Sequence, residues 1–372
     1  MAMIIWLTGF SGSGKSTLAK KLAERISKCK ILDGDEIRKT ISKDLGFSEE
    51  DRKENILRVI KRAKNLQSKG WNVIVALMSP YRKLRKMARD TLKDFFEVYV
   101  KCPIAICKRR DPKSLYEKFE KGKIKNISGL DLPYEAPEDP EIVVETDKET
   151  IEESVVKIMQ KVSKTIVVLG QRRSGTSMLS GILYYLGIPV GATPSQRTWV
   201  NPKGFFEDRE IIKISEEILN YFKEHPGVSE RELDELFGKK IEKTINKKLR
   251  DIWAFKDVNQ VVLHKLYQKY IPNPRYLIIF RNPFSIVRSL KRWFSETNFW
   301  FYFDFVRFQT SSLMKLTLNL AESYPLLLLS YERSLEEPEK TVDEIIQFLG
   351  IKVTKRRREK AIAHISPEIK HF

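Results

Sequence analysis

A run of glycines, hydroxyls and one lysine near the start of the chain could hold phosphate groups. Residues 9–17 read GFSGSGKST and fit the spacing G-x-x-x-x-G-K-[ST], between an apolar segment and a helix-like one. In such a phosphate-binding loop (P-loop), the lysine reaches the β- and γ-phosphates and the following hydroxyl holds Mg²⁺. The sequence therefore predicts an ATP site with Mg²⁺ held at Ser16, made of Gly9, Phe10, Ser11, Gly12, Ser13, Gly14, Lys15, Ser16 and Thr17.

Two carboxylates follow the next apolar segment. Residues 30–35, KILDGD, read as a short strand that ends in Asp33 and Asp35, beside the P-loop if the sheet is parallel. Carboxylates at that place orient Mg²⁺ or accept a hydroxyl proton during phosphoryl transfer. A turn with a helix-capping aspartate is the structural alternative. We expect Lys15, Asp33 and Asp35 among the catalytic residues.

A second loop that could hold an anion lies in the middle of the chain. Residues 171–177, QRRSGTS, follow an apolar segment but lack the P-loop spacing and its lysine. Two arginines and several hydroxyls at the start of a helix can still surround an anion, although a basic turn is the alternative. More than a hundred residues later a predicted strand ends at Arg281, and Ser289 lies eight residues on, in a helix expected near Pro283. This pair could converge on one phosphate.

The elements that must position these residues form two successive series. Predicted strands lie at residues 3–9, 30–35, 71–79 and 95–102, then at 165–170, 276–280 and 326–331, with helices at 15–28, 49–69, 149–162 and 177–187. Residues 110–140, rich in Lys, Gly, Pro and Asp, predict a long loop. The alternation predicts an α/β fold of two tandem P-loop-type domains, each a three-layer parallel sheet, at 1–163 and 164–372.

Composition narrows the class of protein. The 372 residues carry a formal net charge of +19, which suits nucleic acid, an anionic membrane or highly charged nucleotides. Because Lys and Glu are interspersed along the chain, we favour nucleotides and a lysine-rich surface, and expect no nucleic acid. No stretch reaches the roughly 20 apolar residues that a membrane span needs.

The compartment is inferred from the N-terminus and the cysteines. Residues 1–7 are apolar, lack a basic leader and run into the P-loop, so we interpret them as a buried strand rather than a signal peptide. Cys29, Cys102 and Cys107 fit neither a disulfide framework nor a metal site. We expect a cytoplasmic protein.

The first series resembles the adenylylsulfate kinase family, which transfers the γ-phosphoryl group of ATP to the 3′-hydroxyl of adenosine 5′-phosphosulfate (APS) and yields PAPS. The resemblance covers residue 4 to about residue 145 through WLTGFSGSGKST, LDGDEIR, DLGFSEEDRKEN, SPYR, RDPKSLY and IKNISGLDLPYEAPEDPEIV. Another small-molecule kinase on the same scaffold is the alternative. The spacing of Arg52 and Asn55 and the long loop favour APS.

The resemblance implies roles for single residues. Arg110 would lie on the ATP adenine, Phe47 would stack on the APS adenine, and residues 110–135 would form a lid. Ser79 stands where a phosphorylated serine intermediate has been described, although direct in-line transfer needs none, and we include it among the catalytic candidates. The implied APS contacts are Asp35, Arg38, Phe47, Arg52, Asn55, Met78, Ser79, Lys113, Asn126 and Ile127. Where the family usually has Phe-Thr-Gly, residues 127–129 are Ile-Ser-Gly, which loses about 1 kcal/mol of stacking.

The second series resembles PAPS-dependent sulfotransferases between about residues 165 and 355. Besides the two anion-binding stretches, NPKGFFEDRE, FKDVNQ and SYERSLEEPEKTVDEIIQFLGI look like bacterial members. In that family the first loop binds the 5′-phosphosulfate, and the Arg and Ser eight residues apart bind the 3′-phosphate. The implied PAPS site is Arg172, Arg173, Ser174, Gly175, Thr176, Ser177, Arg281 and Ser289.

Sulfuryl transfer also needs a group to stabilise the leaving 5′-phosphate oxygen and a base for the acceptor. The resemblance implies Arg173 for the first role and Glu207 for the second, with Asp257 as the alternative base. A surface pair of Glu207 with Arg209 is the structural alternative. We expect His264 on a helix surface.

The two readings complement each other, because PAPS would be made by the first domain and used by the second. We therefore expect a bifunctional enzyme that needs ATP, Mg²⁺, APS and PAPS and sulfates an unidentified acceptor. An active kinase with a non-catalytic PAPS-binding or regulatory second domain is the alternative. Nine aromatic residues between 293 and 308 indicate either packing or an apolar acceptor site. A homodimer is possible, as in many members of the first family.

Overall fold

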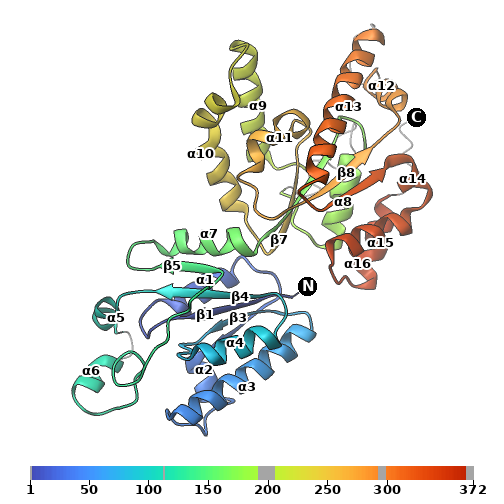
Figure 1. Cartoon of the computed structure of the whole chain (residues 1–372). Coiled ribbons are helices and arrows are strands. Elements are labelled where there is room, and N and C mark those ends of the chain that lie inside the picture. Colours follow the sequence, from blue (N-terminus) through green and yellow to red (C-terminus); the bar gives the residue numbers. More distant parts are fainter. Residues whose placement is uncertain (1, 112–113, 192–205, 292–298, 366–372) are drawn as a thin grey trace. The chain divides into compact units, whose positions relative to one another are not determined.

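The computed structural model describes residues 2–111, 114–191, 206–291 and 299–365 (Figure 1). The chain divides into two compact units, Met1–Val162 and Ser163–Phe372. Within the described residues, no helix is long and apolar enough to cross a membrane. The three cysteines are free.

The first unit is built on a sheet of five parallel strands in the order β2-β3-β1-β4-β5. Its strands are β1 (Ile4–Thr8), β2 (Cys29–Asp33), β3 (Asn72–Ala76), β4 (Phe95–Lys101) and β5 (Ile142–Glu145). Its helices are α1 (Lys15–Ala23), α2 (Gly34–Lys39), α3 (Glu49–Ser68), α4 (Arg82–Thr91), α5 (Ile104–Arg110), α6 (Leu115–Glu120) and α7 (Ile151–Val162).

Central strand β1 shows why this sheet has helices on both faces. Its residues IIWLT are all buried, as expected for a parallel strand covered on each side. Ile4 and Trp6 pack in one cluster with residues of α3 and α4. Helices α1 and α7 pack together and lie on the opposite side of the sheet (Figure 1). Strands β1 and β2 lie on either side of β3 in the sheet. Because the strands are parallel, the carboxyl ends of β1 and β2 point to the same side of the sheet.

The second unit has a sheet of four parallel strands in the order β7-β6-β8-β9. Its strands are β6 (Lys164–Gly170), β7 (Ile252–Lys256), β8 (Pro274–Phe280) and β9 (Leu326–Ser330). Its helices are α8 (Thr176–Leu186), α9 (Arg209–Glu224), α10 (Glu230–Lys248), α11 (Gln260–Gln268), α12 (Pro283–Lys291), α13 (Phe299–Ala321), α14 (Tyr331–Glu336), α15 (Pro338–Leu349) and α16 (Lys355–His364). Helix α8 follows the 171–177 loop and packs on β6, β7 and α16.

The α/β class and the parallel sheets are confirmed, and all seven predicted strands are present. Three details differ from the prediction. The helix expected at 15–28 ends at Ala23, because the chain must turn before β2 begins at Cys29. The region 110–140 contains the short helix α6. The edge strands β5 and β7 were not predicted.

Candidate active sites in the two units

A cavity of about 1440 Å³ in the first unit brings most of the predicted kinase residues together. Those on its walls are Ser11, Gly12, Gly14, Lys15, Ser16, Thr17, Asp33, Asp35, Arg38, Phe47, Arg52, Asn55, Met78, Ser79, Arg110, Asn126 and Ile127. Lys113 lies outside the described residues. Gly9, Phe10 and Ser13 are not among the lining residues, and the Phe10 ring packs instead with a cluster that includes Cys102 and Cys107.

The P-loop and the acids after β2 meet at one end of this cavity. Lys15 donates through Nζ to the carbonyl oxygens of Gly9 and Phe10, at 2.8 and 2.6 Å. The Ser16 hydroxyl donates to Oδ2 of Asp33 at 2.6 Å, and Asp33 Oδ1 accepts from the backbone N–H of Asp35 at 3.0 Å. Asp33 is thus the N-cap of α2, as the structural alternative predicted, and also the partner of Ser16. A hydroxyl next to a carboxylate is a donor set that suits Mg²⁺.

Arg110 and Thr146 lie together at the opposite side of the P-loop. The Arg110 guanidinium donates to the carbonyl oxygen of Thr146 at 2.6 Å and to that of Gly12 at 3.4 Å. The Thr146 hydroxyl donates to the carbonyl oxygen of Ser13 at 2.8 Å. Sequence reasoning missed Thr146, which directly follows the unpredicted strand β5.

Three of the predicted APS residues lie together, with the Phe47 ring between the guanidinium groups of Arg38 and Arg52. The Phe47 ring is 57% exposed and lies 4.5 Å from the Arg38 guanidinium and 5.8 Å from that of Arg52. Arg52 donates to the carbonyl oxygen of Phe47 at 3.1 Å and also to that of Asn126. Burial lowers the pKa of both arginines, so an anion bound beside them would meet incompletely solvated charges.

The segment expected to be a lid folds back on itself at Ile127. Asp131 accepts from the backbone N–H groups of Asn126 and Ile127, at 2.6 and 2.5 Å. Gly129 has φ +91°, and a Cβ there would stand 2.4 Å from the Phe10 ring. The segment therefore packs on the first residues of the P-loop while Asn126 and Ile127 line the cavity.

Ser79 lies shortly after β3 and lines the cavity, but its hydroxyl is hydrogen-bonded to a core residue. The residue is 2% exposed, and its Oγ accepts from the indole Nε1 of Trp6 at 3.0 Å. Its backbone adopts the left-handed conformation, with φ +45°. These contacts give Ser79 a structural part beside any catalytic one.

In the second unit the 171–177 loop wraps around the N-terminus of α8. The Ser174 hydroxyl donates to the carbonyl oxygen of Gln171 at 2.8 Å, which closes the turn. Gly175 has φ +105°, and a Cβ there would stand 2.4 Å from the ring of Tyr331, so only glycine fits. The same Tyr331 ring also contacts Arg281, whose guanidinium lies 4.4 Å from the centre of the ring.

The structure brings together three residues predicted to bind PAPS. Arg173 donates through Nε to the Ser289 hydroxyl at 3.0 Å, and Arg281 donates to the carbonyl oxygen of Arg173 at 2.9 Å. Burial lowers the pKa of both guanidiniums, and the nearby Arg281 lowers that of Arg173 further. A bound phosphate would relieve this repulsion. Arg172 points elsewhere, toward Oδ1 of Asn259 at 3.5 Å.

A buried lysine joins the candidate base to the same loop. Lys256, the last residue of β7, is 2% exposed, lies 2.7 Å from Oε1 of Glu207 and donates to the Ser177 hydroxyl at 3.1 Å. Burial lowers its pKa, and the Glu207 carboxylate opposes that effect. Sequence reasoning missed Lys256 although it stands in the quoted FKDVNQ stretch. A lysine at the end of a parallel strand, facing a loop that binds anions, is the signal that could have found it.

The alternative base, Asp257, is less accessible than Glu207. It is 1% exposed, and its carboxylate accepts from the backbone N–H of Asn259 at 2.9 Å and from the Gln260 amide at 3.4 Å. Burial raises its pKa. The Glu207 side chain is 24% exposed, so of the two carboxylates it is the one that an acceptor could reach.

The expectation that His264 lies on a helix surface is wrong. His264 is fully enclosed, with Nε2 2.8 Å from the hydroxyl of Tyr276, and burial lowers its pKa to about 4. It belongs to the buried stripe of α11 together with Gln260, Leu263 and Tyr267. That spacing of three and four residues is the helical periodicity of a packed face.

The aromatic stretch is partly packed and partly exposed, and the packing interpretation is confirmed for its packed part. Tyr302 packs in a small core with Ile286 and Val287 of α12, whereas Phe301 and Phe308 are exposed. Residues 293–298 of this stretch lie outside the described residues.

Comparison with known proteins matches both halves of the chain to families. Residues 1–145 match the adenylylsulphate kinase family, and residues 165–355 match the sulfotransferase family. The adenylyl-sulfate kinase of Staphylococcus carnosus is 49% identical over 165 residues, which cover 43% of this chain and 83% of the relative.

Two solved structures are similar to parts of the chain. The APS kinase of Mycobacterium tuberculosis, solved with AMPPNP and APS, is 40% identical and covers 42% of this chain and 95% of its own, with a TM-score of 0.40. The sulfotransferase domain from the curacin biosynthetic pathway is 16% identical and covers 53% of this chain and 77% of its own, with a TM-score of 0.32. On the strength of the sequence matches, this chain belongs to the adenylylsulfate kinase family through its first unit and to the sulfotransferase family through its second.

Proposed function

We propose that the chain makes PAPS in its first unit and uses PAPS as a sulfuryl donor in its second. The observation that carries the first step is the single cavity in which the P-loop and the Arg38–Phe47–Arg52 cluster share walls. One end of that cavity suits a nucleoside triphosphate, and the other suits an adenine ring that carries an anionic group. Membership of the adenylylsulfate kinase family supports APS as this acceptor.

In the first step the 3′-oxygen of APS attacks the γ-phosphorus of ATP. A new O–P bond forms, the bond to the β-phosphate oxygen breaks, and the 3′-hydroxyl proton passes to a carboxylate. The Asp33 carboxylate accepts a hydrogen bond from the Ser16 hydroxyl, and these two residues would hold Mg²⁺. The bound ion would neutralise part of the phosphate charge. Asp35, in the first turn of α2, is then the better placed proton acceptor. Lys15 and the helix N-terminus of α1 stabilise the charge on the transferred group.

In the second step an acceptor oxygen or nitrogen attacks the sulfur of PAPS. The S–O bond to the 5′-phosphate breaks, adenosine 3′,5′-bisphosphate leaves, and the acceptor proton passes to Glu207. Arg281 and Ser289, already linked through Arg173, would hold the 3′-phosphate. Lys256 holds the Glu207 carboxylate and reaches Ser177 of the anion loop, so it joins the base to the donor site.

The first step is tested with ATP and APS and chromatographic detection of PAPS. We expect PAPS from the wild-type chain and a fall of at least about a hundredfold for Lys15→Ala, because a charge that stabilises the transition state is removed. Lys21→Ala is the matched control, since Lys21 lies on the same helix but pairs with Glu24 at the surface. Phosphorylation of other small molecules but not of APS would contradict the assignment.

The second step is tested by supplying PAPS and an extract of the source cells and searching by mass spectrometry for products heavier by one SO₃ group. Glu207→Gln should abolish these products and leave PAPS synthesis unchanged, while Glu216→Gln, on the exposed side of α9, should behave as wild type. Tight binding of PAPS without any sulfated product would favour the non-catalytic alternative.

A further inference from the structure

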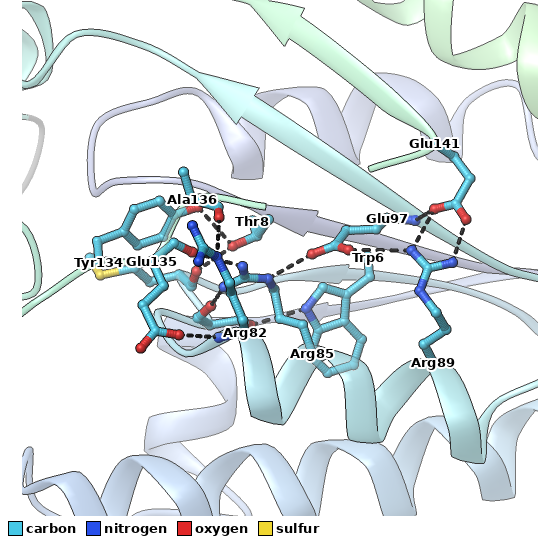
Figure 2. Close-up of polar contacts among 12 residues, drawn as sticks. Trp6, Thr8, Arg82, Arg85, Arg89, Glu97, Tyr134, Glu135, Ala136 and Glu141 are labelled. Carbon is cyan, nitrogen blue, oxygen red and sulfur yellow. Dashed lines mark hydrogen bonds and ion pairs between the residues drawn. The ribbon is translucent and has the colours of Figure 1, made fainter. Parts of the chain in front are cut away.

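A buried arginine behind the cavity joins three separate segments of the first unit. Arg85 of α4 is 2% exposed and donates from three nitrogens (Figure 2). Its Nε donates to Oε1 of Glu97 on β4 at 2.6 Å. Its two terminal nitrogens donate to the carbonyl oxygens of Ser79 and Glu135, at 2.6 and 2.7 Å. One guanidinium thus links the sheet, the turn after β3 and the last residue of the expected lid.

The two loop segments that Arg85 grips also hold each other. The backbone N–H of Glu135 donates to the carbonyl oxygen of Pro80 at 2.9 Å. The Thr8 hydroxyl donates to the carbonyl oxygen of Met78 at 2.6 Å and lies 3.0 Å from the hydroxyl of Tyr134. These contacts join residues 78–80 to residues 134–135 around Thr8, at the end of β1.

Glu97, the ion-pair partner of Arg85, is itself held by further charged side chains. Glu97, which accepts from Arg85, also lies 3.3 Å from a guanidinium nitrogen of Arg89. Arg89 in turn pairs with both oxygens of Glu141. A fork of fixed N–H directions inside such a chain of ion pairs can be held in only one orientation.

Arg85 itself contacts the acceptor end of the cavity through Ser79, and its three hydrogen bonds go to Glu97, Ser79 and Glu135 rather than to the P-loop. Ser79 lines the cavity in a left-handed conformation, which costs about 1 kcal/mol for a residue with a side chain. That conformation is held by the contacts of Trp6 with its hydroxyl and of Arg85 with its carbonyl oxygen. The P-loop backbone is held by Lys15, which donates to Gly9 and Phe10, and it meets the Arg85 arrangement through the Phe10 ring, whose centroid lies 4.7 Å from that of Tyr134.

We propose that Arg85 is a positioning residue for the phosphoryl acceptor. Arg85 does not touch the substrate. It fixes the cavity wall at Met78 and Ser79 relative to Glu135, at the C-terminal end of the segment that carries Asn126 and Ile127. The proposal rests on the proposed kinase step. Reacting groups displaced by about 1 Å can lose about a hundredfold in rate, so small shifts of this wall have measurable consequences.

The test compares Arg85→Gln and Arg85→Lys with Arg89→Gln in the full-length chain. Arg89 shares Glu97 but, among the described residues, forms no hydrogen bond with Ser79 or Glu135, so its variant measures the loss of the ion pairs with Glu97 and Glu141 without the loss of the two loop contacts. KM for APS, KM for ATP, kcat and the thermal unfolding midpoint are measured for each. For Arg85→Gln we expect kcat/KM for APS to fall about 10- to 100-fold while KM for ATP stays within about threefold.

Arg89→Gln should lower the unfolding midpoint but leave KM for APS unchanged. Arg85→Lys keeps the charge beside Glu97 without the fork, so it should fold and still raise KM for APS. Equal effects of Arg85→Gln on both substrates, an unchanged KM for APS in Arg85→Lys, or equal effects of the Arg85 and Arg89 variants would overturn the proposal. A wild-type chain that does not phosphorylate APS would instead contradict the proposed function.

Discussion

The buried ammonium of Lys256 determines how the second unit can use its carboxylates. An ammonium and a carboxylate 2.7 Å apart attract strongly where water is excluded, and each also needs hydrogen-bond partners there. Lys256 has Ser177 as such a partner, and the anion loop is therefore tied to the candidate base. Removing either charge alone would leave the other uncompensated, which distinguishes this pair from an exposed one such as Arg231 with Glu235 on α10.

Asp257 gives the second unit a pH-dependent term in its stability. Burial raises the pKa of Asp257 in the folded state above the ordinary 3.8, which applies to the unfolded chain. At a pH between the unfolded and the folded pKa, the folded state therefore binds more protons than the unfolded state. Stability therefore falls as pH rises through that window. Asp257→Asn removes the titration, and we expect the stability of wild type relative to this variant to decrease from about pH 4 upward.

Hydrogen exchange of peptides from β6 and β8 measures this effect within the second unit. A difference between wild type and Asp257→Asn that is independent of pH would show that the carboxyl group does not change its protonation in the folded state. Sulfuryl transfer should survive the substitution, since the proposed base is Glu207.

At the level of the elements, the expected lid is held at a close contact between Gly129 and Phe10. Gly129→Ala would place a Cβ 2.4 Å from the Phe10 ring, whereas Gly122→Ala meets no atom of the described structure within 4 Å. Both glycines have positive φ, so both variants bear a similar conformational cost of about 1 kcal/mol. We expect only Gly129→Ala to move the segment off the P-loop, and KM for APS to rise about 10-fold.

Steady-state kinetics with varied APS concentration checks this prediction, with Gly122→Ala as the control. Equal KM values for the two variants would mean that the contact with Phe10 does not position the segment. A rise in KM for ATP alone would place the effect in the P-loop.

The elements also explain which parts of the sites could be predicted from sequence. The P-loop and Arg281 follow the apolar strands β1 and β8, most of whose residues are buried and whose pattern is clear. Thr146 directly follows the edge strand β5, and Lys256 is the last residue of the edge strand β7. These two strands were not predicted, so the residues at their ends were missed as well. The network of Arg85 joins distant segments through backbone carbonyl groups, which carry no sequence signal.

At the scale of the whole molecule, the formal charge of +19 fits a chain whose two proposed sites both handle polyanionic nucleotides. The first site combines a P-loop with Arg38 and Arg52, and the second combines Arg173 with Arg281. In each unit the anion loop stands between a central strand and the helix that follows it. The product proposed for one unit is the donor proposed for the other, which gives a reason for their union in one chain.

The most direct measurement follows PAPS and adenosine 3′,5′-bisphosphate by chromatography when ATP, APS and an extract of the source cells are mixed with each of three proteins. Wild type should form both nucleotides, above the background of the extract alone. Lys15→Ala should form neither until PAPS is added, after which the bisphosphate should return. Arg281→Ala should accumulate PAPS and release little bisphosphate. Wild-type release of bisphosphate by Arg281→Ala, or none from Lys15→Ala supplied with PAPS, would contradict a two-step relay in this chain.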